Sequence, residues 1–153
     1  MRCVVKKIAL VVLIIICAFI INPWIYCFDN LNCASKIAGF GFPLVLSNYQ
    51  VKAKRGMLAV FYPLDEVRNV VLTKSSSEFK TDNRPEWQEI YFVDCVSAEA
   101  LIKDNKIFLF YFGAESGYYS IRCDEGMTFD EAEGVYKMIA DVEAPKIPAW
   151  VYN

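Results

Sequence analysis

Apolar and polar positions divide the chain into an uninterrupted apolar start, an alternating middle and a helically periodic end. Fourteen apolar residues run from Ile8 to Ile21 without a charge, and low polarity continues to Phe28. A stretch of that full length reaches the roughly 20 residues that a helix needs to cross a bilayer. The pattern therefore predicts a transmembrane signal-anchor helix over residues 8–28.

The residues after the apolar core decide between an anchor and a cleaved signal peptide. Cleavage needs small residues at an A-x-A-like site soon after the core. The sequence there is bulky, Asn22-Pro23-Trp24, and the first tolerable site lies far downstream at residues 33–35. Trp24 and Tyr26 also resemble the aromatic belt of a membrane interface. An uncleaved anchor is favoured, with a cleaved and secreted chain as the first alternative and a buried helix of a soluble protein as the second.

Charge around the apolar start predicts the orientation of the chain. Arg2, Lys6 and Lys7 precede the run, and only Asp29 follows closely. Basic residues are retained on the cytoplasmic side of a membrane. We therefore expect a single-pass protein of a bacterial inner membrane, with residues 1–7 in the cytoplasm, 8–28 in the membrane and 29–153 in the periplasm.

The middle of the chain alternates as strands do. Residues 33–50 show no clean period and are expected to form an irregular lead-in, and residues 74–86 a polar loop. Apolar or β-branched runs bounded by turn residues predict strands at 56–63, 69–73, 88–94, 100–103, 106–112 and 118–123. Asp104-Asn105 predicts a tight hairpin, because both residues tolerate positive φ. The last three of these strands predict an antiparallel meander.

The period changes to that of a helix after residue 127. Thr128 and Glu131 have the spacing of a capping box. An apolar stripe follows at helical spacing, and Pro145 ends it; the stripe is Ala132, Val135, Tyr136, Ile139 and Ala140. Together these patterns predict an α+β fold, in which an N-terminal membrane-anchor helix is followed by a small antiparallel sheet packed against a C-terminal helix.

Six cysteines are distributed along the chain, and their predicted locations differ. Cys3 precedes the apolar run and Cys17 lies within it. The remaining four would face an oxidising compartment, where disulfides form. Among the pairings we favour Cys33 with Cys123, because that bridge would close a long loop; Cys27 and Cys95 are expected to remain free.

Residue composition removes several kinds of chemistry. The chain has no histidine, which excludes Ser-His and Cys-His nucleophilic pairs. The acidic residues of 124–133 lack calcium-loop spacing, and Lys74 beside three serines is interpreted as part of a loop. A net charge of −2 argues against nucleic acid as a partner. We expect no catalytic residue, no cofactor and no metal.

Aromatic residues make up 15% of the chain and favour a binding role, because tyrosine and tryptophan are enriched at interfaces. The candidate interaction surface is Trp150, Tyr118 and Tyr119. We expect a protein-binding domain, such as an immunity protein or inhibitor directed against an envelope-acting toxin or hydrolase; the alternative is an accessory or structural subunit of an envelope complex. A third class, a carboxylate-dependent cell-wall hydrolase, would require two carboxylates facing one cleft.

Overall fold

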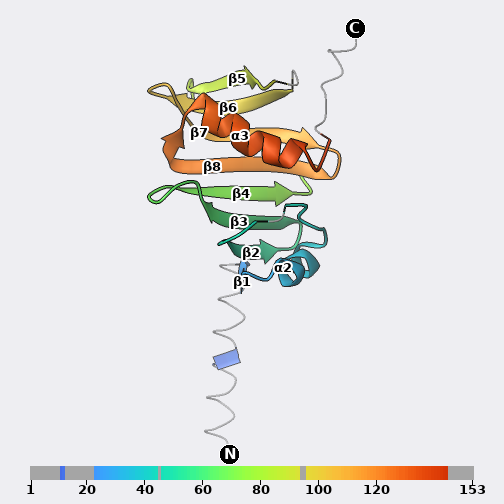
Figure 1. The fold of residues 1–153 in the computed structure, drawn as a ribbon. Coiled ribbons are helices and arrows are strands. Elements are labelled where there is room, and N and C mark those ends of the chain that lie inside the picture. The colour runs from blue at the N-terminus through green and yellow to red at the C-terminus, as the bar shows by residue number, and fades with distance from the viewer. Residues whose placement is uncertain (1–10, 13–22, 45, 94–95, 145–153) are drawn as a thin grey trace, which may run out of the picture.

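Within the described residues, an eight-stranded antiparallel sheet forms the body of the protein, and two helices accompany it (Figure 1). The computed structural model describes residues 11–12, 23–44, 46–93 and 96–144. The strands are β1 (Ile25–Phe28), β2 (Gln50–Lys54), β3 (Met57–Pro63), β4 (Asn69–Ser75), β5 (Trp87–Tyr91), β6 (Ser97–Lys103), β7 (Lys106–Ala114) and β8 (Gly117–Met127). The helices are α2 (Leu31–Ala38) and α3 (Phe129–Ala140).

The strand order shows that two meanders meet at the centre of the sheet. The order is β1-β2-β3-β4-β8-β7-β6-β5, so the chain runs twice from an edge of the sheet to its centre. After β4 it crosses to the far edge and returns through β5, β6 and β7 to place β8 beside β4. Every pairing is antiparallel. The edge strands β1 and β5 are therefore as far apart as the sheet allows.

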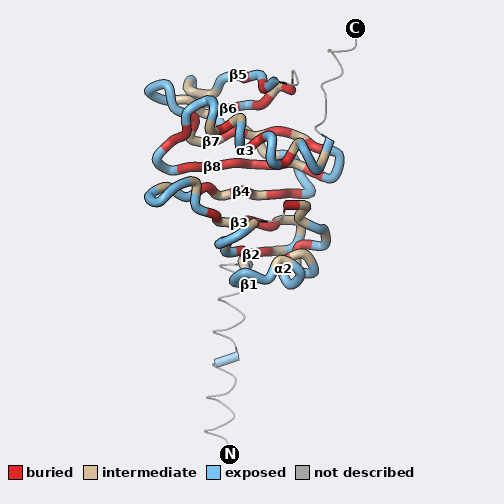
Figure 2. Tube along the Cα trace, in the orientation of Figure 1, coloured by how far each residue is buried: buried red, intermediate tan, exposed pale blue. Residues whose placement is uncertain are grey.

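One face of the sheet is buried across the six strands between its two edges. Residues in register across six strands form a single cross-strand row, and each is fully excluded from solvent. This row is Val51, Val60, Leu72, Ile121, Phe110 and Ala100. Because successive side chains of a strand point to opposite faces, the alternation in each strand fixes which face is buried. Figure 2 shows the buried positions concentrated in the central strands.

The two helices cover this inner face at different places. Helix α2 packs on β1, β2 and β3, where Ala34 and Ala38 are buried. Helix α3 lies on β7 and β8 and buries its predicted stripe. Its Tyr136 stacks on Phe92 with ring centroids 4.4 Å apart and meets Phe112 edge-on at 5.1 Å. Such aromatic pairs add about 0.5–1.5 kcal/mol each beyond the area that they bury.

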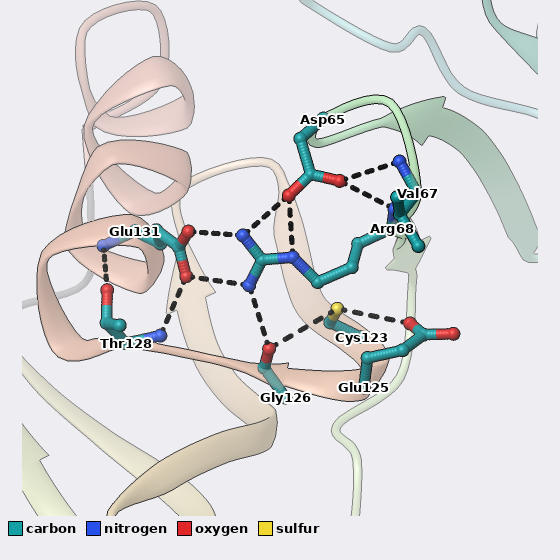
Figure 3. Close-up of polar contacts among 8 residues, drawn as sticks. All are labelled: Asp65, Val67, Arg68, Cys123, Glu125, Gly126, Thr128 and Glu131. Carbon is teal, nitrogen blue, oxygen red and sulfur yellow. Dashed lines mark hydrogen bonds and ion pairs between the residues drawn. The ribbon is translucent and has the colours of Figure 1, made fainter.

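Arg68 fastens the beginning of α3 to the turn between β3 and β4 (Figure 3). Its guanidinium donates to both carboxylate oxygens of Glu131, to Asp65, and to the carbonyl of Gly126 at 3.2 Å. Glu131 also accepts from the backbone N–H of Thr128 at 2.8 Å and so completes the capping box. The Arg68 and Thr128 hydrogen bonds hold the pKa of Glu131 at about 2.

A buried ion pair fastens the other end of α3. The Nζ of Lys74 lies 2.6 Å from Glu143, just after the helix, and donates to the carbonyl of Gly41 at 3.1 Å. Only 3% of the Lys74 side chain and 11% of the Glu143 side chain are exposed. Ser116 donates to the other carboxylate oxygen. Burial acts to raise the pKa of Glu143, but the hydrogen bonds outweigh it and leave that pKa below its ordinary value.

The predicted α+β fold with an N-terminal anchor helix is wrong. The sheet has eight strands and dominates the fold, and residues 25–28 form strand β1 at its edge. The physical reason is local: only Cys27 of the strand is buried, while its neighbours Tyr26 and Phe28 are exposed. That alternation has the period of a strand.

Other elements of the sequence interpretation concern the anchor and the lead-in. Apart from residues 11–12 and 23–28, the predicted anchor lies outside the described residues. Within the part of the chain that the structure describes, no helix is long and apolar enough to span a membrane. The lead-in predicted to be irregular contains most of α2 and the first residue of β2.

Several local predictions are confirmed. Helix α3 has the predicted capping box, and its buried residues are Ala132, Val135, Tyr136 and Ile139. The tight hairpin is present, with φ of 51° at Asp104 and 58° at Asn105. The valine-rich segment predicted as a strand at 69–73 is strand β4, and the three-strand meander of the second half is β6, β7 and β8.

Breaking the buried pair should destabilise the protein strongly. Lys74→Ala leaves the Glu143 carboxylate buried without its cation, a change that costs about 3–5 kcal/mol. The exposed control Lys137→Ala removes only the surface contact with Glu133 and should stay within about 0.5 kcal/mol. Urea denaturation of the purified variants measures both. Equal losses for the two would show that the buried pair has no special role.

The ion pair between Arg68 and Glu131 should make the unfolding free energy of the protein depend on pH. The pKa of Glu131 lies below its unfolded value, so its contribution is fully present above about pH 4.5 and is lost as the pH falls toward 2. Glu131→Gln has no such titration. The difference in unfolding free energy between wild type and this variant should therefore shrink from pH 5 to pH 2. If the unfolding free energies of wild type and Glu131→Gln changed in parallel over that pH range, the stabilising role of the Arg68–Glu131 ion pair would be contradicted.

Candidate binding pocket on the outer face

The second face of the sheet, here called the outer face, carries polar and aromatic side chains and changes charge along its width. One cross-strand row reads from β2 to β5 as Lys52, Ala59, Thr73, Ser120, Tyr111, Glu99 and Glu89. Lys52 and Lys54 lie beside Trp24, each 5.0 Å from its ring centroid. The outer face is therefore basic near β2 and acidic near β5.

A pocket of about 430 Å³ lies at the acidic end. Its floor is the outer face of β5 to β8, and the segment between β4 and β5 supplies one wall. This outer-face pocket is lined by Glu78, Phe79, Thr81, Trp87, Gln88, Glu89, Ser97, Glu99, Tyr111, Phe112, Gly113 and Tyr118. The volume falls within the range of small-molecule and side-chain pockets.

Aromatic rings build the wall of the outer-face pocket around Tyr111. Phe79 stacks on Tyr111 with ring centroids 5.1 Å apart and an interplanar angle of 16°. Trp87 approaches the same ring at 5.1 Å. The three residues come from the β4–β5 connection, β5 and β7, so their contact also holds that connection against the sheet. Partial burial raises the pKa of Tyr111, with Asp82 as a further cause.

Three carboxylates line the outer-face pocket without a basic residue among the lining side chains. Glu89 and Glu99 are directly opposite one another on β5 and β6. Like charges in that position destabilise a sheet. No salt bridge of the described residues involves either carboxylate. Tyr91 donates a hydrogen bond to Glu89, which raises the tyrosine pKa.

A neighbouring carboxylate is neutralised within the protein. Asp82 accepts from the Nε of Arg84 at 2.7 Å and from the indole N–H of Trp87 at 2.7 Å. These hydrogen bonds hold the pKa of Asp82 at about 2. Asp82 therefore orients the Trp87 ring, while the negative charge available to a ligand is that of the three glutamates. An acidic, aromatic surface of this kind recognises cations, by ion pairing and by cation–π contact.

The structure does not bring Cys33 and Cys123 together. Cys33 is exposed on α2, which packs on β1 to β3, whereas Cys123 is buried on β8. Strand β4 separates β3 from β8. Both thiols are free, and burial raises the pKa of Cys123. Cys27 is also a free thiol in the structure, and Cys95 lies outside the described residues.

The three aromatic residues predicted as an interaction surface have different locations. Tyr118 is half-buried and lines the outer-face pocket. Tyr119 points to the inner face, where it is fully buried and stacks on Phe112 at 5.3 Å. Trp150 lies outside the described residues. Adjacent residues of a strand point to opposite faces, so Tyr118 and Tyr119 could not share one surface.

Sequence reasoning missed the principal residues of the pocket. Trp87, Glu89, Glu99 and Tyr111 are dispersed over three strands, and no motif links them. A signal was nevertheless present: Glu89 and Glu99 each occupy a polar position of an alternating strand. The five residues between β5 and β6 would then place these glutamates opposite one another once the hairpin is assumed.

No protein-family model matches this chain, and no curated protein or solved structure shows significant similarity to it. The inference of function therefore depends on the geometry and charge of the outer-face pocket.

Proposed function

We propose that this chain is a protein-binding domain that takes a lysine or arginine side chain of its partner into the outer-face pocket. The observation that carries the proposal is the opposed pair Glu89 and Glu99, beside the rings of Trp87 and Tyr111. A cation between the two carboxylates relieves their repulsion, and the aromatic rings provide a surface for its aliphatic stem.

This chemistry is suited to a binding partner with a basic surface. Acidic and aromatic groups in one concave site give both charge complementarity and buried contact area. An immunity protein or inhibitor that covers a basic active site of an envelope-acting toxin or hydrolase has this requirement. An accessory subunit that docks on a basic segment of an envelope complex is the alternative within the same binding class.

A specific observation supports a second candidate, the carboxylate-dependent hydrolase. Glu89 and Glu99 face one pocket with aromatic rings, as glycoside hydrolysis requires of its carboxylate pair. A catalytic acid, however, normally depends on burial to retain its proton near neutral pH. Both glutamates are exposed, which favours binding of a cation over proton transfer.

Neutralising the opposed glutamates should weaken binding without weakening the fold. Fluorescence anisotropy with a labelled peptide of alternating lysine and serine would measure affinity, with a glutamate-serine peptide as the control ligand. The Glu89→Gln/Glu99→Gln variant should bind the basic peptide about tenfold less tightly, because ion pairing and cation–π contact together contribute about 1–2 kcal/mol. Its stability should be unchanged or raised by up to about 1 kcal/mol.

The charge-matched control for this experiment is Glu66→Gln/Asp141→Asn, which removes two charges at exposed positions outside the pocket, one in the β3–β4 turn and one at the end of α3. It should bind the basic peptide nearly as tightly as wild type at 0.15 M salt, where the Debye length is about 8 Å. An equal loss for both variants would mean that net charge alone attracts the peptide. No binding by wild type would refute the proposed pocket chemistry.

We further propose that the domain is exported across a bacterial inner membrane. The support is the charge-free run Ile8–Ile21, preceded by Arg2, Lys6 and Lys7. An alkaline phosphatase fusion after Asn153 should be enzymatically active, because that enzyme requires an oxidising compartment to form its disulfides. An inactive fusion would refute export. The size of the exported chain would separate retention of the apolar run from its cleavage.

A further inference from the structure

Two cysteines flank the turn that joins edge strand β1 to helix α2. Cys27 lies in β1 and Cys33 in the first turn of α2, with five residues between them. Cys27 is 6% exposed and belongs to the small core cluster that also contains Ala34 and Ala38. Cys33 is exposed to solvent. One thiol is thus accessible to a reagent, and the other is sheltered beside it.

Asn30 holds both cysteine backbones in place. Its backbone N–H donates to the carbonyl of Cys27 at 2.9 Å, and its side-chain oxygen accepts from the N–H of Cys33 at 2.9 Å. Phe28 adopts a φ of 53°, which turns the chain sharply after Cys27. Because both cysteines are hydrogen-bonded to Asn30, the turn restrains the distance between their backbones.

The side chains of Cys27 and Cys33 lie on the same turn, within reach of one another. Burial is the main cause that raises the pKa of the Cys27 thiol, and a hydrogen bond with Cys33 adds to it. A disulfide needs Cβ atoms about 3.5–4.5 Å apart, and the hydrogen bonds of both residues with Asn30 hold them on one short turn. Among the described cysteines, Cys27 and Cys33 are the pair that the fold brings together.

We propose that Cys27 and Cys33 form an intramolecular disulfide that ties edge strand β1 to α2. The oxidant is a disulfide of the surrounding compartment, such as oxidised glutathione. The Cys33 thiolate attacks one of its sulfurs and releases one glutathione thiolate. Cys27, once deprotonated, then attacks the Cys33 sulfur and releases the second. The two cysteine protons pass to the two glutathione thiolates, and two electrons pass from the protein to the oxidant.

The bond would act at a weakly secured position of the sheet. Strand β1 has a partner on one side alone, β2, and its pairing is interrupted by a register shift between Tyr26 and Phe28. Helix α2 is only eight residues long and depends on packing against β1 to β3. A covalent link between the two elements would resist separation of the edge strand from the sheet.

Mass spectrometry of the full-length protein tests the linkage. The protein is reduced, equilibrated with oxidised glutathione, denatured, alkylated and cleaved on the amino side of Asp29, which separates Cys27 from Cys33. Fragmentation of the non-reduced product should locate a bond between these two cysteines. Cys27→Ser and Cys33→Ser should each abolish it, whereas Cys123→Ser should leave it intact.

The competing outcomes are distinct. A bond from Cys33 to Cys95 or Cys123, or full alkylation of Cys27 and Cys33 in wild type, would overturn the proposal without reference to any variant. Thermal unfolding gives a second readout, because cross-linking a loop constrains the unfolded chain. Oxidised wild type should melt about 5 °C above Cys33→Ser, and reductant should remove the difference. No difference would show that the bond does not restrain the fold.

Discussion

Removal of one face of the sheet from water is the constraint on which this fold depends. The inner row from Val51 to Ala100 crosses six strands without an exposed side chain. Two short helices cover so wide a face only when each is held in position. Burial of α3 through Tyr136 and Ile139 supplies the driving force, while its placement over β7 and β8 depends on polar contacts at its two ends.

The polar contacts at the two ends of α3 differ in how far they are exposed to solvent. Arg68 and Glu131 are partly exposed, so their bidentate geometry orients the helix more than it stabilises the protein. Lys74 and Glu143 are nearly excluded from solvent, and their charges can be buried only as a satisfied pair. Lys74 is a buried residue of β4, and its ammonium also donates to the carbonyl of Gly41, which links that segment to the end of α3. The end of α3 is thus held on the inner face by the Lys74 ammonium, which can be buried there because Glu143 pairs with it.

Local structure was predictable where the pattern is local. The capping box at Thr128, the stripe of α3 and the Asp104-Asn105 hairpin each depend on neighbours within a few residues, and each is confirmed. Helix α2 escaped prediction because eight residues give too few turns for a clear period. Strand β2 does alternate, with Val51 and Ala53 inward, but its two lysines and short length concealed the pattern.

Long-range arrangement could not be deduced from one sequence. The crossing from β4 to the far edge of the sheet, which sets β8 beside β4, is fixed by packing of the whole inner face. The anchor interpretation of residues 25–28 failed for a local reason: apolar residues suit both a membrane helix and an edge strand, and only the alternation around Cys27 separates the two. The pairing of Cys33 with Cys123 assumed proximity that only the strand order could decide.

The opposed glutamates of the outer face are a feature that packing of the sheet does not explain. Stability alone would not select two glutamates directly opposite one another beside Trp87 and Tyr111, since neutral residues would serve the sheet better. A local cost that persists in an otherwise consistent fold is most simply explained by a ligand that offsets it. The same reasoning separates this carboxylate pair from Lys74 and Glu143, whose charges satisfy one another. The opposed glutamates form no salt bridge among the described residues, and we therefore propose them, and not the buried pair, as the place of binding.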